Sequence, residues 1–299
     1  MTTITTVAIA GASGSLGAPV FEQLLKTDFQ LTVLTRKGSN HTWPSNVTVK
    51  EVDYNSVDSL TEALQGQDAV VSTITSESVG LQSNLVDAAV KAGVKRFIPS
   101  DFGSNTFNEK AAKLPCYIPK VQIRERLEKA AAESDLTWTV VINGIFLDWV
   151  IRVGFFADVK NRTIELPDGG NSLTSGTSLP TVGKAVVGVL KNPEQTKNRP
   201  VYIQETAISL KQIEEILKKH VGADGWKENV ISVDDILKNA LEEKNKTGLS
   251  LNVFLSTLKV GIWGKGYGGH FDKLDNELLG IKQLSPEEVE AIMAANIPK

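Results

Sequence analysis

Cysteine and histidine are scarce in this chain of 299 residues, which contains one cysteine and three histidines. The single cysteine, Cys116, excludes an internal disulfide and a cysteine metal cluster. His41, His220 and His270 lie far apart in the sequence, without the spacing of metal ligands. We therefore expect no metal site and interpret these histidines as surface or half-buried polar residues.

Long apolar runs and an excess of positive charge are also missing. The chain has no apolar run of about 18 residues, so no membrane-spanning helix is expected. A net charge of −3 argues against nucleic acid as the main partner. A predicted strand begins within a few residues of Met1, without a basic or leader-like segment, which favours a cytoplasmic location. The sequence is compatible with a monomer or a homodimer.

The first 150 residues alternate between strand and helix patterns. This alternation predicts an α/β fold of the Rossmann type, a doubly wound parallel sheet with helices on both faces. Ligands bind such sheets at the carboxyl ends of the strands. The expected strands cover 7–12, 29–36, 47–54, 67–74, 94–103 and 136–146, and the expected helices cover 18–27, 56–66 (with Ser56 as N-cap), 81–93 and 120–134.

After residue 150 the alternation weakens. We expect residues 1–150 to form the nucleotide-binding core, with 180–206 returning to it, and 151–179 and 207–299 to form a smaller substrate-binding α/β part. The pattern predicts hairpin and loop over 154–176, a helix over 179–194, a strand over 199–205, helices over 209–222 and 233–243, a glycine-rich loop over 260–272, and a helix that begins at Ser285 and Pro286.

Three glycines spaced three residues apart follow the first predicted strand. Gly11 permits a sharp turn, Gly14 lets the backbone approach a pyrophosphate, and Gly17 lets strand and helix pack closely. The N–H groups at the start of the next helix are free to bind phosphate. The spacing is typical of the short-chain reductase superfamily and predicts a dinucleotide site formed by Gly11, Ala12, Ser13, Gly14, Ser15, Leu16 and Gly17.

The end of the second predicted strand discriminates between the two dinucleotides. An NAD site places Asp or Glu there, whereas this chain has Thr35, Arg36 and Lys37. A guanidinium can bind a 2′-phosphate in a bidentate manner, so Arg36 with Lys37 predicts NADP(H). The alternative is a solvated basic turn. Asp53 ends the third strand and is assigned either to the adenine amino group or to a surface N-cap.

Several segments together resemble a known family. They are the glycine turn, Arg36, "VVSTI" (70–74), "KRFIPSDFG" (95–103) and "YIPKVQIRERLEKAAAESDLTWTVVINGIF" (117–146). In these segments the chain resembles the NmrA-like branch of atypical short-chain reductases, and within it the isoflavone reductase-like group. "NGIFLDW" is more similar to the fungal members, which are aromatic alcohol or isoflavone reductase-like proteins.

The resemblance implies a catalytic lysine in the K-x-x-I-R segment, which is Lys120 here. The main branch of the superfamily uses Tyr-x-x-x-Lys, but Tyr117 lies one residue too close to Lys120 and Pro119 stands between them. Tyr117 is therefore not assigned as the proton donor. Our hypothesis is that burial and the like charge of Arg124 tune Lys120 as a general acid or base. The alternative is an ordinary surface lysine.

Further site residues are expected at the strand ends and in the C-terminal part. For Ser100 and Asp101 the alternative is a capped turn, and for the aromatic residues it is a place in the core. Cofactor contacts are assigned to Thr73, Ser76, Ser100, Asp101, Lys120, Asn143 and Phe146, and substrate contacts to Phe102, Trp149, Phe155, Trp263, Tyr267 and Phe271.

Three functions compete on this basis. The first is NADPH-dependent reduction of an aromatic, phenylpropanoid-like or isoflavone-like small molecule. The second is a non-catalytic redox sensor of the NmrA type that acts through protein partners. The third is an NADPH-dependent quinone-reducing or isomerising enzyme. Plant relatives carry a histidine in the loop after "PSDFG", whereas residues 102–119 contain none, which argues against lignan-type substrates.

Overall fold

The computed structural model describes residues 3–298, except the side chains of residues 76 and 77, and its centre is a parallel sheet of seven strands. The strand order is β11-β6-β5-β4-β1-β2-β3. The chain adds β2 and β3 on one side of β1 and then β4, β5 and β6 on its other side, as in a Rossmann fold. The predicted fold class is thus confirmed. The strands are β1 (Thr6–Ala10), β2 (Gln30–Arg36), β3 (Thr48–Val52), β4 (Ala69–Ser72), β5 (Arg96–Ile98), β6 (Thr137–Ile142) and β11 (Arg199–Tyr202).

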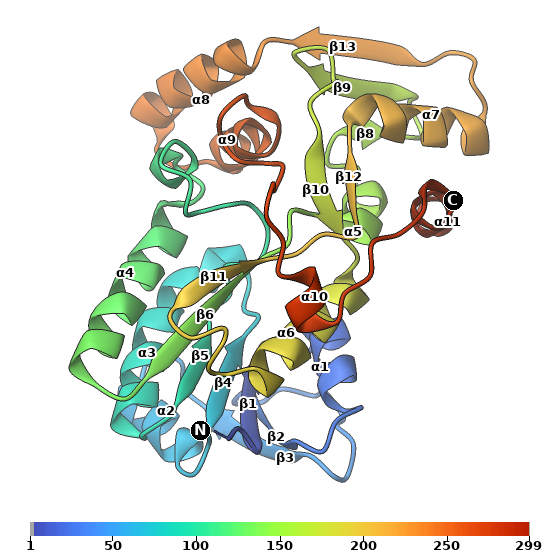
Figure 1. Ribbon diagram of the computed structural model, residues 1–299. Coiled ribbons are helices and arrows are strands. Elements are labelled where there is room, and N and C mark those ends of the chain that lie inside the picture. Colours follow the sequence, from blue (N-terminus) through green and yellow to red (C-terminus); the bar gives the residue numbers. More distant parts are fainter. Residues whose placement is uncertain (1–2, 299) are drawn as a thin grey trace.

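Alternating side chains of β1 divide the core between the two faces of this sheet. Val7 and Ile9 belong to a cluster with α1 (Gly17–Leu24), α6 (Leu179–Lys191) and α10 (Asn276–Leu279). Ala8 and Ala10 belong to a second cluster with α2 (Val57–Leu64), α3 (Gln82–Lys91) and α4 (Ile118–Glu133). Figure 1 shows the two groups of helices on opposite sides of the sheet, as a strand buried on both faces requires.

The remaining elements lie beyond the carboxyl ends of the main strands (Figure 1). They surround a separate apolar cluster that includes Ile145, Leu166, Ile213 and Trp263. Two small sheets are formed by β7 (Ile145–Phe146), β10 (Thr174–Thr177) and β12 (Thr206–Ile208), and by β8 (Ala157–Asp158), β9 (Thr163–Pro167) and β13 (Lys227–Ile231), with α5 (Leu147–Arg152), α7 (Leu210–Val221), α8 (Val233–Thr247), α9 (Leu251–Trp263) and α11 (Pro286–Ala295) around them.

Most predicted elements are confirmed, including two local details. Ser56 caps α2 by accepting a hydrogen bond from the Ser59 N–H, and β11 pairs with β6 in the main sheet. The prediction that the glycine-rich loop begins at residue 260 is wrong, because residues 260–263 are the last turn of α9. The apolar residues of α9 leave no clear amphipathic stripe to indicate a helix.

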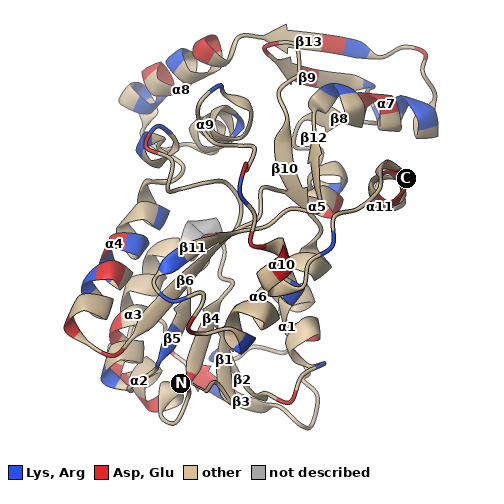
Figure 2. Ribbon diagram, in the orientation of Figure 1, with Lys and Arg blue, Asp and Glu red and all other residues tan. Residues whose placement is uncertain are grey.

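Positive and negative side chains are interspersed along the outer helices α4, α7 and α8 (Figure 2). These helices therefore present mixed charge to solvent. Within residues 3–298, none of the helices has the length and apolar character needed to cross a membrane.

Candidate active site

The glycine turn after β1 packs so tightly that two of its positions accept only glycine. Gly11 has φ of 85°, and a Cβ there would lie 2.8 Å from the carbonyl carbon of Thr73. A Cβ on Gly17 would lie 1.9 Å from the Gly11 carbonyl oxygen. The Gly14 N–H donates a 3.0 Å hydrogen bond to that same oxygen. The glycines thus form a compact turn against the end of β4, with its backbone open to a ligand.

The start of α1 adds a positive backbone end to this turn. Its N-cap residue, Leu16, makes no side-chain capping hydrogen bond, and the first turn of the helix contains no acidic residue. Leu16 packs against the core, while Ser13 and Ser15 are exposed. Because helix N-terminal N–H groups attract anions, the geometry suits a pyrophosphate.

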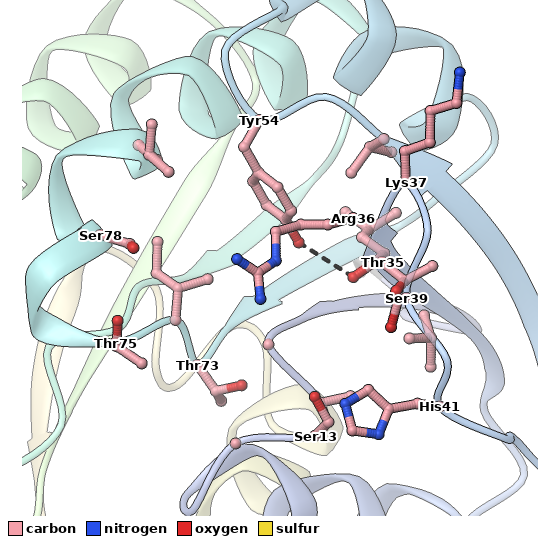
Figure 3. A pocket seen from close by; sticks show the side chains of 18 of the residues that line it. Ser13, Thr35, Arg36, Lys37, Ser39, His41, Tyr54, Thr73, Thr75 and Ser78 are labelled. Carbon is pink, nitrogen blue, oxygen red and sulfur yellow. Dashed lines mark hydrogen bonds between the residues drawn. The ribbon is translucent and has the colours of Figure 1, made fainter.

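A cavity of about 720 Å³ extends from the turn across the ends of β2, β3 and β4. This size fits a nucleotide-like ligand. The predicted residues that line it belong to the glycine turn or follow the carboxyl ends of strands. Figure 3 also shows polar lining residues that the sequence does not predict, such as Ser39, His41 and Tyr54. The cavity is lined by Gly11, Ala12, Ser13, Gly14, Val33, Leu34, Thr35, Arg36, Lys37, Ser39, His41, Trp43, Val52, Asp53, Tyr54, Asn55, Thr73, Ile74, Thr75, Ser78 and Leu81.

Arg36 and Lys37 behave differently although they are neighbours. In Figure 3 the Arg36 guanidinium reaches into the cavity below the Tyr54 ring, whereas the Lys37 amino group points away from its centre. The Tyr54 hydroxyl donates a 3.1 Å hydrogen bond to the Leu34 carbonyl. Burial raises the pKa of Tyr54 to about 12, with the charge of Arg36 acting in the opposite direction. Tyr54 is thus a neutral support beside an inward guanidinium.

The polar residues predicted at the other strand ends are largely engaged with the backbone. The Thr73 hydroxyl donates to the Ala10 carbonyl at 2.9 Å, and that of Ser100 donates to the Ile74 carbonyl at 2.8 Å. Asp53 accepts a 2.9 Å hydrogen bond from the Asn55 N–H. Because Ser56 caps α2, the N-cap alternative for Asp53 is wrong. The side chain of Ser76 lies outside the described residues.

Lys120 lies in the first turn of α4, where two groups that follow β5 fix its amine. Nζ donates a 2.9 Å hydrogen bond to the Phe102 carbonyl. Asp101 Oδ1 lies 3.6 Å from the same nitrogen, and its side chain is 4% exposed against 16% for Lys120. The amine therefore stands at the carboxyl edge of the sheet, next to a buried carboxyl group.

Asp101 changes the expected electrostatics of this lysine. Burial raises the pKa of Asp101, while the charge of Lys120 and a hydrogen bond from the Thr106 hydroxyl act against the rise. Arg124 donates to the Thr106 carbonyl at 2.8 Å and stacks over Phe107 at 4.5 Å. The sequence-based hypothesis names Arg124 alone as the charged neighbour that tunes Lys120. The structure adds a second charged neighbour of Lys120, the carboxyl group of Asp101, at 3.6 Å from the amine.

Tyr117 is enclosed by protein. Its side chain is 2% exposed, and a Cβ on Gly261 of α9 would lie 2.5 Å from its hydroxyl oxygen. Burial raises the pKa of Tyr117 well above its ordinary value. These observations agree with leaving Tyr117 out of the catalytic assignment.

Asn143 and Phe102 shape the site through their backbone contacts. The Asn143 side chain is fully buried and accepts a 2.9 Å hydrogen bond from the Gly103 N–H. The Phe102 ring is 6% exposed in the main core, while its carbonyl holds Lys120. The cofactor contact of Asn143 stays a prediction, because the structure shows only the hydrogen bonds that its amide makes within the protein. Asn143 holds the turn that carries Phe102 and Gly103.

Burial separates the aromatic candidates into two groups. Trp263 is 2% exposed and stacks with Phe155 at 6.0 Å, and Phe271 is 5% exposed and meets Tyr202 edge-on at 5.4 Å. Both rings are packed in the protein interior, as the core alternative expects, and their substrate contact stays a prediction. Phe102 is buried as well, whereas the remaining candidates are half-buried, namely Phe146, Trp149, Phe155 and Tyr267.

Comparison of the sequence with known protein families identifies the family of this chain. The family model described as "NmrA-like family" matches residues 3–256. This chain belongs to the NmrA-like family. A curated member, "Oxidoreductase aprR" from Aspergillus flavus, is 34% identical over 296 residues, covering 95% of this chain and 97% of that protein.

Solved structures share the NmrA-like fold seen here. One is described as "AtPrR2 with NADP+ and (+)pinoresinol", with a TM-score of 0.77, 20% identity, and coverage of 98% of this chain and 100% of that one. Another is the binary complex of leucoanthocyanidin reductase with NADPH from Vitis vinifera, with a TM-score of 0.77, 21% identity, and the same coverage. The predicted resemblance is confirmed at the level of family and fold.

Sequence reasoning missed several residues that line the cavity of this NmrA-like protein. Tyr54 follows Asp53 at a strand end, and that position was a usable signal. Ser39, His41 and Trp43 come from an irregular loop after β2, where no periodic pattern indicates which side chains turn inward. The sequence alone therefore indicates only a surface or half-buried polar residue at His41.

Proposed function

We propose that this protein is an NADPH-dependent reductase of an aromatic, phenylpropanoid-like or isoflavone-like small molecule. The observation that carries the proposal is the placement of the Lys120 amine. It stands at the same sheet edge as the glycine turn, held by the Phe102 carbonyl at 2.9 Å and facing Asp101 at 3.6 Å. The cavity that suits the cofactor and the hydrogen-bonded amine of Lys120 thus lie at one edge of the sheet.

The residues at the cavity fit the proposed cofactor. The glycine turn excludes a side chain at Gly11 and Gly17, and the start of α1 has neither a side-chain cap nor an acidic residue, which suits a pyrophosphate. Arg36 reaches into the cavity, and no acidic residue ends β2, which suits a 2′-phosphate rather than a free ribose hydroxyl. The relatives that are solved with NADP+ or NADPH support this assignment.

Lys120 would supply the proton chemistry. An ammonium has three N–H donors. The Phe102 carbonyl takes one and Asp101 faces the amine at 3.6 Å, which would leave a third for a substrate oxygen. When bound, NADPH supplies a hydride. Lys120 would stabilise the oxygen that becomes negative and donate a proton to it, or deprotonate a substrate phenol. Asp101 would keep the amine in place during these steps.

A screen for NADPH oxidation tests the proposal against the redox-sensor alternative. The protein is incubated with NADPH and a panel of aromatic enones, aldehydes and benzylic ethers, and the loss of NADPH absorbance is followed. We expect oxidation with at least one compound and slower oxidation with NADH in place of NADPH. Tight NADPH binding without oxidation of any compound would contradict the reductase and support the sensor.

A further inference from the structure

The loop between β2 and β3 brings an unassigned histidine to the cavity. His41 lines the cavity, and Figure 3 shows its ring pointing inward. The adjacent Trp43 packs edge-on against Phe21 of α1, with ring centroids 5.3 Å apart, and its centroid lies 6.0 Å from that of His41. Because Phe21 belongs to the main core, Trp43 fixes the loop and hence the place of His41.

Among the other titratable groups that line the cavity, Arg36 is the cation that points inward, so a bound phosphate could take a second cation. Arg36 points inward and Lys37 points away from the centre. Asp53 already accepts hydrogen bonds from the Asn55 backbone and side-chain nitrogens. Tyr54 is neutral because burial raises its pKa to about 12. A phosphate carries about −1.5 to −2 charge at neutral pH, more than one guanidinium neutralises.

We propose that His41 is a second 2′-phosphate-binding residue, whose ring when protonated donates a charge-assisted hydrogen bond to the phosphate, so that NADP(H) binds more tightly as the pH falls. The inference rests on the proposed cofactor and names a residue of this chain that makes its binding pH-dependent. Histidine is the side chain that ordinarily changes charge between pH 5 and 8. Hydrogen bonds between charged groups are about twice as strong as neutral ones, so the effect is measurable.

Calorimetric titration with two small probes tests the role of His41 without knowledge of the substrate. The probes are 2′,5′-ADP, which carries the 2′-phosphate, and 5′-AMP, which does not. They are titrated at about pH 6 and about pH 8.5, on either side of the histidine range. The proteins are the wild type, His41→Gln, His41→Lys, and His270→Gln as an exposed histidine outside the cavity lining.

The measured quantity is the ratio of the 2′,5′-ADP dissociation constants of variant and wild type at one pH, because the phosphate itself titrates near pH 6. For His41→Gln we expect a ratio of about ten at the lower pH and near one at the higher pH. His41→Lys should bind at least as tightly as the wild type at the higher pH. The 5′-AMP constants and those of His270→Gln should match the wild type.

A His41→Gln ratio that is the same at both pH values would overturn the inference, since it would indicate a packing role or none. That result would leave the proposed function standing if the wild type still binds 2′,5′-ADP more tightly than 5′-AMP. A wild type that shows no preference for 2′,5′-ADP at either pH would overturn both the NADP(H) assignment and the role of His41.

Discussion

The geometry around Lys120 depends on a few individual groups. Asp101 is almost fully buried, accepts a 2.9 Å hydrogen bond from the Thr106 hydroxyl, and faces the lysine amine. Removing one partner of a buried charged pair leaves the other uncompensated, so Asp101 and Lys120 are expected to act as a unit. The Phe102 carbonyl gives the amine a fixed direction that a free surface lysine does not have.

The titration of Asp101 gives a stability prediction. Burial raises the pKa of Asp101, so the folded chain holds this proton to higher pH than the unfolded chain, whose carboxyl titrates near pH 3.9. The free energy of unfolding therefore falls as the pH rises above that value. Asp101→Asn removes this titration. In urea unfolding from pH 4 to 7, the free energy of unfolding of the variant should increase relative to that of the wild type as the pH rises. A free energy of unfolding of the variant that decreases relative to the wild type over this range would contradict the raised pKa of Asp101.

At the scale of elements, the unit of β1, glycine turn and α1 is the part that the sequence predicts best. Its signals are local: a short apolar strand, glycines at fixed spacing, and a helix pattern directly after them. The close approaches at Gly11 and Gly17 explain why the spacing is strict. In contrast, the sequence does not predict α9, because its buried residues do not form one stripe along the helix. The sequence pattern assigns its last turn to the glycine-rich loop that follows it.

Gly17→Ala tests the packing of this unit. The added Cβ would lie 1.9 Å from a backbone oxygen, which cannot move without opening the turn. We expect a loss of roughly 2–3 kcal/mol in the free energy of unfolding, as for overpacked cores, and at least tenfold weaker NADP+ binding. Gly80→Ala is the matched control, since a Cβ at that position would have no atom within 4 Å. Equal effects of the two substitutions would contradict the tight turn.

In the whole molecule the C-terminal elements lie beyond the carboxyl ends of the main strands (Figure 1). The cavity and the Lys120 amine belong to that edge of the sheet. The sequence predicted this edge, because the carboxyl ends of parallel strands meet there. It could not predict that His41 turns inward, that Asp101 faces Lys120, or that Trp263 is almost fully buried. Those facts depend on loop paths and on contacts between segments distant in the sequence.

Cofactor preference is a property of the whole molecule that thermal unfolding can report. A ligand that binds only the folded state at 100 times its dissociation constant adds about 2.7 kcal/mol, and each 1 kcal/mol corresponds to roughly 2–4 °C in Tm for a chain of this size. We expect NADP+ to raise the Tm more than NAD+ at equal concentration. Arg36→Gln should remove this difference, while Arg126→Gln, an exposed arginine paired with Asp87 outside the cavity lining, should keep it. An equal shift by both dinucleotides in the wild type would contradict the assignment of Arg36.

Lys120 carries the proposed proton chemistry, so the decisive measurement is the kcat of Lys120→Ala beside that of Lys129→Ala. Lys129 is an exposed lysine of the same helix, paired with Glu133 at 4.0 Å. With an aromatic compound that the wild type reduces, we predict that Lys120→Ala lowers kcat by at least about 100-fold and leaves the Kd for NADPH unchanged, because a positioned acid contributes about 10²–10⁴-fold. Lys129→Ala should match the wild type. A kcat of Lys120→Ala equal to that of Lys129→Ala would contradict the account.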